Sequence, residues 1–336
     1  MSALSVSVCI PTYNQAPYLS ETVQSILNQS RQVHEIIISD DASSDDTPAL
    51  CAELRRRIPH LRYHRQPVNL GIAGNTDFVL RQAGGDLVVR VDSDDRLLPE
   101  YVARLAAALE AAPSAGYAHG AVWEIDHLGK RRHVRRLFRP AGIQPADEAL
   151  RAALSGYRVA ANILMFRRIA LVAMNYTTGR PDYVEDYHLS VALAKAGWAN
   201  VYCEETLAEY RVWMDAKQTR AKRKLQEIHG LCRTFDEQLL PGFMERGWSI
   251  QPLMSARKKI AARHAPALSD GHYTMAERAG LIEALVKLGN GWPLRWRLCL
   301  VKLGAGKVVV FQQAVINEAR VKVKNMLATI ATWRRK

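Results

Sequence analysis

The sequence predicts an α/β fold in which a mainly parallel central sheet is flanked by helices and followed by a C-terminal helical extension. Strand-like and helix-like apolar patterns alternate along about the first 125 residues. The strand-like segments are almost continuously apolar, which is typical of strands buried on both faces of a parallel sheet. Beyond about residue 215 the strand patterns end, and helical spacing rich in Lys and Arg takes over.

The first elements are a strand, a helix and a second strand. Residues 5–10 alternate between polar and apolar side chains, and we expect Pro11 to end this strand because proline has no backbone N–H. Leu19, Val23 and Ile26 then recur at helical spacing. Residues 35–39 form a continuous apolar run that predicts a buried strand.

The same alternation continues to residue 125. We expect helices at 47–57, 72–82 and 99–112, and strands at 61–64, 86–91 and 116–125. Pro99 favours a helix start because proline is common in the first turn. Repeated strand–helix units imply parallel strands. We place a domain boundary so that residues 1–214 form one domain and residues 215–336 form a basic helical extension.

Composition is that of a folded protein of the cytoplasm. The 336 residues are 48% hydrophobic and 24% charged, within the range of globular domains. The five cysteines are scattered without a Cys-x-x-Cys pair, which argues against a disulfide framework or structural zinc. The first residues do not resemble a secretory signal, and no apolar run approaches the roughly 20 residues that span a bilayer.

The positive charge is concentrated near the C-terminus. The formal net charge is +13, and residues 287–336 contain eleven Lys and Arg against one acidic residue, Glu318, so this segment carries +10. The basicity therefore belongs to the extension and not to the domain formed by residues 1–214.

Three polar clusters directly follow predicted parallel strands. They are Pro11-Thr12-Tyr13-Asn14, Asp40-Asp41, and Asp92-Ser93-Asp94-Asp95. Because the carboxyl ends of parallel strands meet at one edge of an open sheet, where ligands bind, we expect the clusters to converge on a single crevice.

Asp92, Asp94 and Asp95 place three carboxyl groups within four residues. Their mutual repulsion raises their pKa values unless a cation neutralises them. Hard oxygen ligands suit Mg²⁺ or Mn²⁺. Alone, however, an Asp-x-Asp motif is also typical of a solvated acidic turn before a helix.

Together, the motifs resemble those of family 2 glycosyltransferases, which have the nucleotide-binding GT-A fold. The resemblance covers about residues 4–213 and is carried by the segments 6–14, 36–47 and 91–99, in that order. It implies a donor-binding part at about 1–125 and an acceptor-binding part at about 126–214.

The resemblance implies roles for individual residues at the donor site. Asp41 would accept a hydrogen bond from the donor base, and Asp94 would ligate the Mn²⁺ or Mg²⁺ that bridges the diphosphate. Asp92 and Asp95 would assist with ribose or metal. The other residues assigned to the donor site are Pro11, Thr12, Tyr13, Asn14, Asn75 and Ser93. Asp40 equally fits a structural cap of the following turn.

The resemblance also implies a catalytic base. The segment 184–198 is similar to the family's Glu-Asp segment that opens a helix, so Asp186 would deprotonate the acceptor, with Glu185 orienting it or contacting the acceptor. In-line displacement would invert the anomeric carbon. Both acids also simply suit a helix N-terminus.

Tyr210-Arg211 resembles the family's pair near the donor phosphates, where Arg211 would grip anionic oxygens. An ordinary ion pair with Glu209 is the alternative. Three positions depart from the family's usual residues: Gly74 stands in place of an Arg, Ala42 in place of a Gly, and Trp213 in place of a His. The last departure puts a second metal ligand in doubt.

The end of the chain predicts a basic amphipathic helix. Ile316, Ala319, Val323, Met326, Leu327, Ile330 and Trp333 recur at steps of three and four residues, and Arg320, Lys322 and Lys324 lie largely off this stripe. Such a helix either lies on an anionic inner-membrane surface or packs on the catalytic domain. Nucleic acid is not an expected partner, because the segment has no recognition motif.

The sequence thus predicts a cytoplasmic, inverting glycosyltransferase acting in surface polysaccharide or lipopolysaccharide synthesis, and peripheral contact with the cytoplasmic membrane face stays one of the two options for its extension. Its donor is a nucleoside diphosphate sugar, with UDP or dTDP favoured over GDP, and its acceptor is a saccharide that a lipid can carry. Two alternatives stay open: a non-catalytic nucleotide-sugar-binding subunit of a membrane-associated assembly, and a sugar nucleotidyltransferase. The latter normally has a Gly-rich, Arg-containing phosphate loop after the first strand, and residues 11–14 are not such a loop.

Overall fold

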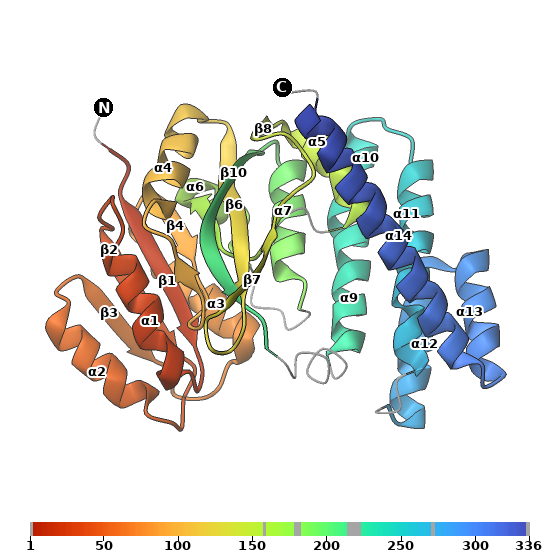
Figure 1. The fold of residues 1–336 in the computed structure, drawn as a ribbon, viewed down its shortest axis with the longest axis horizontal. Coiled ribbons are helices and arrows are strands. Elements are labelled where there is room, and N and C mark those ends of the chain that lie inside the picture. The colour runs from red at the N-terminus through yellow and green to blue at the C-terminus, as the bar shows by residue number, and fades with distance from the viewer. Residues whose placement is uncertain (1–2, 157–158, 178–182, 214–222, 270–272, 334–336) are drawn as a thin grey trace. The chain divides into compact units, whose positions relative to one another are not determined.

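The chain divides into two compact units (Figure 1). The structure is a computed structural model that describes residues 3–156, 159–177, 183–213, 223–269 and 273–333, with side chains through residue 319. The first unit comprises residues 1–153 and 157–216, and the second comprises residues 154–156 and 217–336.

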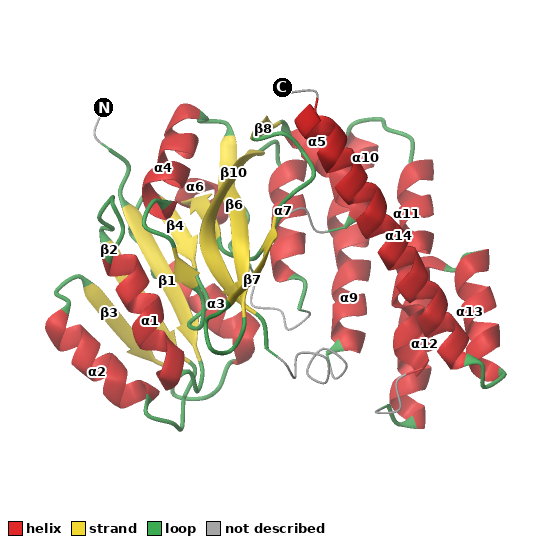
Figure 2. Ribbon diagram, in the orientation of Figure 1, coloured by secondary structure: helices red, strands yellow, loops and turns green. Residues whose placement is uncertain are grey.

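A ten-stranded mixed sheet forms the centre of the described part of the first unit (Figure 2). Its strands are β1 (Val6–Thr12), β2 (Glu35–Asp40), β3 (Leu61–Arg65), β4 (Leu87–Arg90), β5 (Arg96–Leu97), β6 (Ala115–Ile125), β7 (Arg131–Arg135), β8 (Gly142–Gln144), β9 (Leu164–Arg167) and β10 (Ala199–Arg211). The main path runs β3-β2-β1-β4-β9-β6-β10-β5, with β7 paired to β6 and β8 paired to β10.

The N-terminal half of this sheet is parallel. β1 lies between β2 and β4 and is parallel to both, and β3 is parallel to β2. β9 runs antiparallel between β4 and β6, whereas β6 and β10 are parallel to each other. The predicted α/β fold with a mainly parallel sheet is confirmed for this unit.

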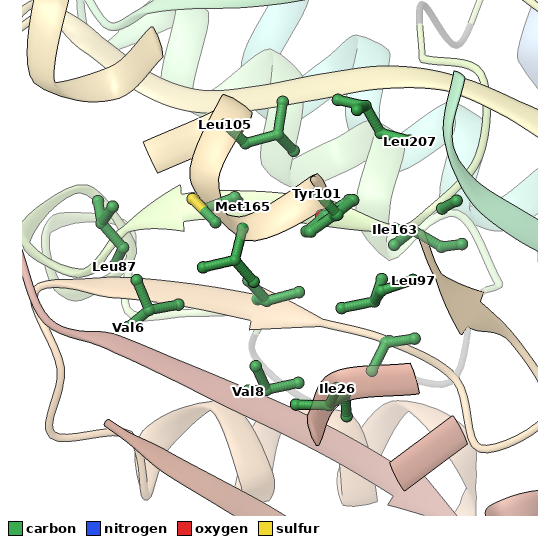
Figure 3. Packing of buried hydrophobic residues seen from close by; sticks show 14 of the residues in the cluster. Val6, Val8, Ile26, Leu87, Leu97, Tyr101, Leu105, Ile163, Met165 and Leu207 are labelled. Atoms are coloured by element: carbon green, nitrogen blue, oxygen red, sulfur yellow. The ribbon is translucent and has the colours of Figure 1, made fainter. Parts of the chain in front are cut away.

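Helices cover both faces of the sheet, as its apolar strands require. The helices and short helical turns of this unit are α1 (Ala16–Leu27), α2 (Thr47–Arg57), α3 (Gly71–Arg81), α4 (Tyr101–Ala111), α5 (Ala146–Ala152), η1 (Ala153–Ser155), α6 (Arg168–Ala173) and α7 (Glu185–Lys195), with the end of η1 falling in the second unit. Alternate residues of each strand face opposite sides. Val8 packs with α1, α2 and α4 in the core drawn in Figure 3, whereas Cys9 packs with α3, α6 and α7.

Pro11 does not end the first strand, contrary to the sequence prediction. β1 continues through Pro11, which pairs with Ser39, to Thr12, which pairs with Asp40. Successive residues of β1 face alternately toward β2 and β4, and the Val91 N–H bonds the Cys9 carbonyl on the β4 side. Pro11 faces that same side beyond the last paired residue of β4. Its missing N–H therefore interrupts no ladder bond.

The second unit is helical. Its elements are α9 (Lys224–Thr234), the π-helical turn η2 (Phe235–Leu239), α10 (Leu240–Glu245), α11 (Gln251–His264), the 3₁₀ turn η3 (Ala265–Ser269), α12 (Met275–Gly289), α13 (Trp292–Lys302) and α14 (Gly306–Trp333). α12 packs against α9 and α11, and Thr274 with Glu277 forms a capping box at its start. The predicted helical extension is confirmed. The amphipathic stripe predicted within α14 falls mostly on residues whose side chains lie outside the description.

No helix in the described ranges combines the length and the apolar character needed to cross a bilayer.

Candidate active site

The first two polar clusters meet where β1 and β2 end. The Asp41 N–H donates to the Thr12 carbonyl at 2.9 Å. Asn14 links the same two loops, because its N–H bonds Ser43 Oγ at 2.9 Å and its side-chain oxygen accepts from the Ser44 N–H at 2.9 Å. The sheet edge thus brings together two of the clusters that the sequence predicted to converge.

Asp40 and Asp41 have different surroundings although both are buried. Asp40 accepts hydrogen bonds from the Ser43 N–H and the Tyr63 hydroxyl, both at 2.9 Å, and so holds the turn after β2. Asp41 accepts from the Leu70 N–H at 2.6 Å. Burial raises the pKa of Asp41, and backbone N–H groups oppose the rise. Asp40 therefore acts as the structural cap, and Asp41 is the acid at the start of α3.

Ala42 adopts a backbone conformation that favours glycine. Its φ is +60°, in the left-handed region that costs an L-residue roughly 1 kcal/mol or more. The turn is over-determined by the bonds to Asp40, which include the Ala42 N–H on the Asp40 carbonyl at 2.9 Å. Alanine is consequently tolerated here without a change of fold.

The third cluster forms a turn directly after β4 in which exposure alternates. Asp92 and Asp94 are half-buried, whereas Ser93 and Asp95 are buried. The Thr22 hydroxyl, on α1, lies 2.9 Å from the Ser93 carbonyl and 2.8 Å from the Asp95 carbonyl, and so fastens this turn. Asp92 and Asp94 are therefore the two acids of the turn that remain accessible.

The carboxyl groups of this turn raise one another's pKa values. Burial, and then the charge of Asp92, raise the pKa of Asp94 to about 6. Burial and the charges of Asp94 and Asp92 hold the pKa of Asp95 well above its usual range. Asp95 accepts from the Arg211 N–H at 2.8 Å through one oxygen, and its other oxygen is buried without a protein hydrogen bond. A cation bound at this turn would relieve the repulsion.

Arg90 joins the third cluster to the predicted base. Its guanidinium donates to Asp186 Oδ1 at 2.7 Å and to Asp92 Oδ1 at 3.1 Å. Asp92 also accepts from the Asn162 side chain at 2.7 Å. Asp186 lies in the first turn of α7, where burial raises its pKa and the Arg90 charge opposes the rise. Two acids far apart in the sequence therefore share one buried arginine.

A cavity of about 200 Å³ opens beside this ion-pair network. Its lining includes Ile72, Ala73, Thr76, Arg90, Asp92, Asn162, Thr177, Tyr183, Glu185, Asp186 and Tyr210. The volume is below the roughly 300–1,000 Å³ typical of pockets that enclose a whole drug-sized ligand. The cavity accordingly suits one part of a larger ligand, and both predicted catalytic acids border it.

Arg211 has a different place from the one expected beside donor phosphates. Its side chain is 1% exposed. It donates to the carbonyls of Asp94 (2.8 Å), Asp126 (2.9 Å) and His127 (3.0 Å), and it contacts Glu21 at 3.3 Å. In this arrangement the guanidinium holds the Asp94 turn through backbone oxygens and does not present a phosphate-binding fork.

Trp213 bonds directly to the predicted metal ligand. Its indole N–H donates to Asp94 Oδ2 at 2.7 Å, and its ring meets Tyr18 edge to face at 5.1 Å between centroids. Since an indole N–H is a donor only, Trp213 cannot ligate a cation. It fixes one oxygen of Asp94 and leaves the other for a ligand.

Asn75 is bound to the sheet. Its amide donates to the Ser39 carbonyl at 2.8 Å and accepts from the Ser39 hydroxyl at 2.6 Å. This pair anchors α3 to β2. Its expected contact with the donor stays a prediction. Tyr13, by contrast, is 49% exposed at the sheet edge and is open to a ligand.

Sequence reasoning missed Arg90, Asn162 and Thr22. For Arg90 a signal was present, because an arginine interrupts an otherwise aliphatic buried strand immediately before the acidic motif. Asn162 and Thr22 carry no such signal, since single polar residues in a loop or on a helix are ordinary.

The oxygen-rich turn fits a hard divalent cation in its chemistry. Asp92 and Asp94 offer carboxylate oxygens, and Asp95 places a further buried oxygen without a protein hydrogen bond at the same turn. Within the described ranges no three acidic, His or Cys side chains form a ready-made cage. Mg²⁺ and Mn²⁺ sites commonly take only one or two carboxylates and complete their shell with substrate phosphates and water.

Residues 7–171 match the sequence model of the family described as glycosyl transferase family 2. The domain that contains residues 7–171 belongs to glycosyltransferase family 2. The match contains the β1, β2 and β4 edge and the acidic turn, and it ends before Asp186. The family assignment therefore agrees with the order of motifs that the sequence analysis identified.

Several curated relatives carry glycosyltransferase names. The chain is 37% identical over 144 residues to the GalNAc(5)-diNAcBac-PP-undecaprenol beta-1,3-glucosyltransferase of Campylobacter jejuni, covering 43% of this chain and 45% of that enzyme. It is 28% identical over 258 residues to an N-acetylglucosaminyltransferase of Mesorhizobium japonicum, covering 73% and 59%. The chain thus spans about half the length of these relatives.

Solved structures share the fold at low sequence identity. Residues 1–349 of TarS from S. aureus superpose with a TM-score of 0.59 and 16% identity, covering 90% of this chain and 92% of that one. The mannosyltransferase PcManGT from Pyrobaculum calidifontis, solved with GDP-Man and Mn²⁺, gives a TM-score of 0.56 with 19% identity, covering 96% and 87%. The predicted GT-A fold is confirmed.

Proposed function

We propose that this chain is an inverting glycosyltransferase that moves a sugar from a nucleoside diphosphate sugar to a hydroxyl group of a saccharide acceptor. The observation that carries the proposal is the shared contact of Asp92 and Asp186 with Arg90, at 3.1 and 2.7 Å. It joins the acidic turn, where a diphosphate would sit, to an acid suited to activating an acceptor.

Asp186 is the base in this proposal. Its Oδ1 is held by Arg90, which fixes the orientation of the carboxyl group and leaves Oδ2 to take the proton of the acceptor hydroxyl. Its raised pKa makes the carboxylate a better proton acceptor than an exposed aspartate. With Asp186 as base and the diphosphate at the acidic turn, we propose that attack and departure occur on opposite faces of the sugar, which inverts the anomeric carbon.

Asp94, with help from Asp92, would hold Mn²⁺ or Mg²⁺. When bound, such a cation supplies the positive charge that stabilises the departing diphosphate. Trp213 and Arg211 keep Asp94 in place, through its carboxyl group and its carbonyl respectively. Asp95 stays behind the turn, bound to the Arg211 N–H.

The nucleoside is proposed to bind at the ends of β1 and β2. Thr12 has a buried hydroxyl without a protein hydrogen bond, and Asp41 lies one strand away. Tyr13, exposed at the same edge, offers a ring to stack on. UDP and dTDP are our favoured nucleotides over GDP. TarS has been solved with UDP and with UDP-GlcNAc, whereas PcManGT was solved with GDP-Man, so the relatives include both nucleotide classes.

A lipid-linked saccharide is the acceptor that we propose. The relative from Campylobacter jejuni is named for an undecaprenol-linked acceptor, and another relative is a chondroitin synthase of Escherichia coli. Both names fit assembly of a polysaccharide. For this chain the pathway would be synthesis of a surface polysaccharide or lipopolysaccharide at the cytoplasmic membrane face.

Thermal unfolding with nucleotides tests the donor site. UDP, dTDP and GDP are each added with and without Mn²⁺ to the wild type, to Asp94→Asn, and to the matched control Asp147→Asn on α5. A ligand at 100 times its dissociation constant adds about 2.7 kcal/mol to the folded state. We expect one nucleotide to stabilise the wild type and the control when Mn²⁺ is present, and Asp94→Asn to lose the effect.

Turnover separates the proposal from its alternatives. Release of the nucleoside diphosphate from a matching donor supports a transferase. Binding without any release, across saccharide acceptors and water, would point to a binding subunit. Pyrophosphate release from a nucleoside triphosphate and a sugar phosphate would point to a nucleotidyltransferase.

A further inference from the structure

Helix α13 of the second unit has one buried and one exposed face. Leu294 and Arg297 lie on the buried face. The Arg297 side chain bonds the Ala262 carbonyl of α11 and, at 3.0 Å, the Gln313 side chain of α14. These contacts fix the rotation of α13 within the unit, so the exposed face is a property of the fold.

The exposed face of α13 is apolar. Trp292, Trp296, Cys299 and Leu303 are all exposed and follow the spacing i, i+4, i+7 and i+11, which places them on one stripe. Trp292 is 74% exposed, Trp296 is 47% exposed and Leu303 is 75% exposed. The two indoles stack with their planes 8° apart and their centroids 6.3 Å apart.

The first turns of α14 carry a second exposed apolar stripe. Val308, Phe311 and Val315 are exposed at the spacing i, i+3 and i+7, and Phe311 is 68% exposed. Single exposed apolar residues are ordinary, but gathered ones mark an interaction site. We call the exposed stripe of α13, made of Trp292, Trp296 and Leu303, the aromatic face.

Cations accompany the aromatic face, and acids do not. Arg295 and Lys302 are exposed on one flank of the α13 stripe, and Lys307 is exposed at the start of α14. From Trp292 to Asn317 the sequence has no Asp or Glu. This surface therefore suits a partner that is both nonpolar and negatively charged.

We propose that the aromatic face binds the surface of an anionic phospholipid bilayer. Tryptophan favours the membrane–water interface because its ring is apolar and its N–H is polar. Lys and Arg add attraction to anionic headgroups. The helices lie in the interface and do not cross it, in the manner of amphipathic helices that bury one face among the headgroups.

This inference deepens the proposed function. Only the reason for docking, access to a lipid-linked acceptor, rests on that function. A lipid-linked acceptor is confined to a membrane surface, so an enzyme docked there meets it at high local concentration. The sequence analysis had pointed to the stripe from Ile316 to Trp333 of α14, which stays a prediction, and the described side chains add the exposed face of α13. Membrane docking and nucleotide binding are measured separately, so failure of one does not imply failure of the other.

Sedimentation with vesicles tests the proposal on the full chain. Vesicles of pure phosphatidylcholine are compared with vesicles containing one third phosphatidylglycerol. We expect the wild type to bind the anionic vesicles, and to bind at least tenfold more weakly when Trp292 and Trp296 are both changed to Ala. Lys302→Gln with Lys307→Gln should weaken binding roughly 25-fold, at about fivefold for each cation, and salt should weaken it further.

Controls separate docking from folding. Met275→Ala removes a residue that is 92% exposed on α12, outside the aromatic face, and should leave vesicle binding unchanged. Each variant should keep the wild-type unfolding temperature and nucleotide response, because the changed side chains are exposed. The proposal is overturned if the wild type does not bind anionic vesicles, if the Trp292 and Trp296 variant binds as well as the wild type, or if these residues instead mediate self-association in solution.

Discussion

A charged residue ends the aliphatic strand β4, and its position sets the chemistry of the site. Arg90 is 7% exposed and contacts Asp92 and Asp186 at once. Burying a guanidinium is unfavourable unless acids pair with it, and burying the acids is unfavourable without the guanidinium. Each of the three charges therefore depends on the other two for its stability and orientation.

Asp186→Asn should strongly slow transfer and leave nucleotide binding intact. Asparagine keeps the shape and a hydrogen-bonding oxygen but cannot take a proton, and general base catalysis typically contributes 10²- to 10⁴-fold. We expect kcat to fall by at least about 10² with an unchanged nucleotide dissociation constant. Glu185→Gln on the same turn is the comparison and should cost less. Equal losses from both changes would contradict the assignment of the base.

Removing the charge of Arg90 should move the acid side of the pH–rate profile upward. The Arg90 cation favours the ionised form of Asp186, so without it the carboxyl keeps its proton to a higher pH and the base form appears later. An adjacent opposite charge shifts a pKa by about 1–3 units. For Arg90→Met we expect half-maximal kcat at least about one pH unit higher.

Arg90→Lys is the companion variant, because it keeps the charge and loses the two-pronged geometry. It should shift the profile less than Arg90→Met does and should also fold more readily. A profile that does not move in either variant would show that Arg90 acts only on stability.

Trp213→Phe should weaken the binding of Mn²⁺ in the presence of nucleotide by about tenfold, in the range found when groups that orient a ligand are removed. Phenylalanine can keep the edge contact with Tyr18 but loses the N–H that holds Asp94 Oδ2. Titration of Mn²⁺ by electron paramagnetic resonance measures the affinity directly. Trp248→Phe, in another edge-to-face pair, is the control. Unchanged or tighter Mn²⁺ binding would refute a positioning role.

Site residues that belong to a motif could be predicted from the sequence. Residues whose place depends only on their contacts in the fold could not. Asp41, Asp92, Asp94 and Asp186 follow strands or open a helix, so their positions could be read from order and spacing. The burial of Arg211 could not be predicted, because its partners are mainly backbone carbonyls from distant loops. Every residue has a backbone oxygen, so the pattern of side chains along the sequence does not reveal which ones Arg211 contacts.

At the level of elements, the sequence predicted β1 to β4 and β6 and missed β5 and β7 to β10. β2 and β4 are continuous aliphatic runs, and the structure has them at nearly the predicted bounds. β7 and β8 are short, polar and exposed, and β9 has only four residues, so none of them has a distinctive period. β10 pairs with β6 through bulges that break its alternation.

Strand β6 carries a buried histidine that should make stability fall in acid. His119 is 1% exposed between the rings of Tyr117 and Tyr202, and neither ring nitrogen has a hydrogen bond. Burial, followed by the charge of Arg139, lowers the pKa of His119 to about 3. The unfolded chain protonates this residue below about pH 6.5, so it binds more protons than the folded chain as the pH falls.

His119→Phe should reduce the loss of stability between pH 7.5 and pH 5 by about 2 kcal/mol, because 1.4 kcal/mol corresponds to one pH unit. Urea unfolding at both pH values measures the difference. His34→Gln changes an exposed histidine and should leave the pH dependence as in the wild type. If His119→Phe shows the wild-type pH dependence, His119 is not held neutral in the folded chain.

At the scale of the whole molecule, the candidate active site and the basic, apolar surface of the extension lie in different units. Every residue of the candidate active site lies in the first unit, whereas the aromatic face and its cations lie in the second. The shift in composition near residue 215 was visible in the sequence. The exposed stripe of α13 was not, since only the packing of Leu294 and Arg297 decides which side of that helix faces outward.

A chain ending at Ala216 should therefore fold and bind nucleotide but not vesicles. The first unit has its own core on both faces of the sheet, built from residues between Val6 and Ala208, and a chain of this length is ordinary for an independent domain. We expect its nucleotide dissociation constant in Mn²⁺ to stay within about threefold of the wild type, and its binding to anionic vesicles to disappear. Calorimetry and sedimentation measure the two properties on the same preparation. A shortened chain that is folded by circular dichroism yet has lost nucleotide binding would mean that the second unit completes the donor site. Retained vesicle binding would place the membrane contact in the first unit instead.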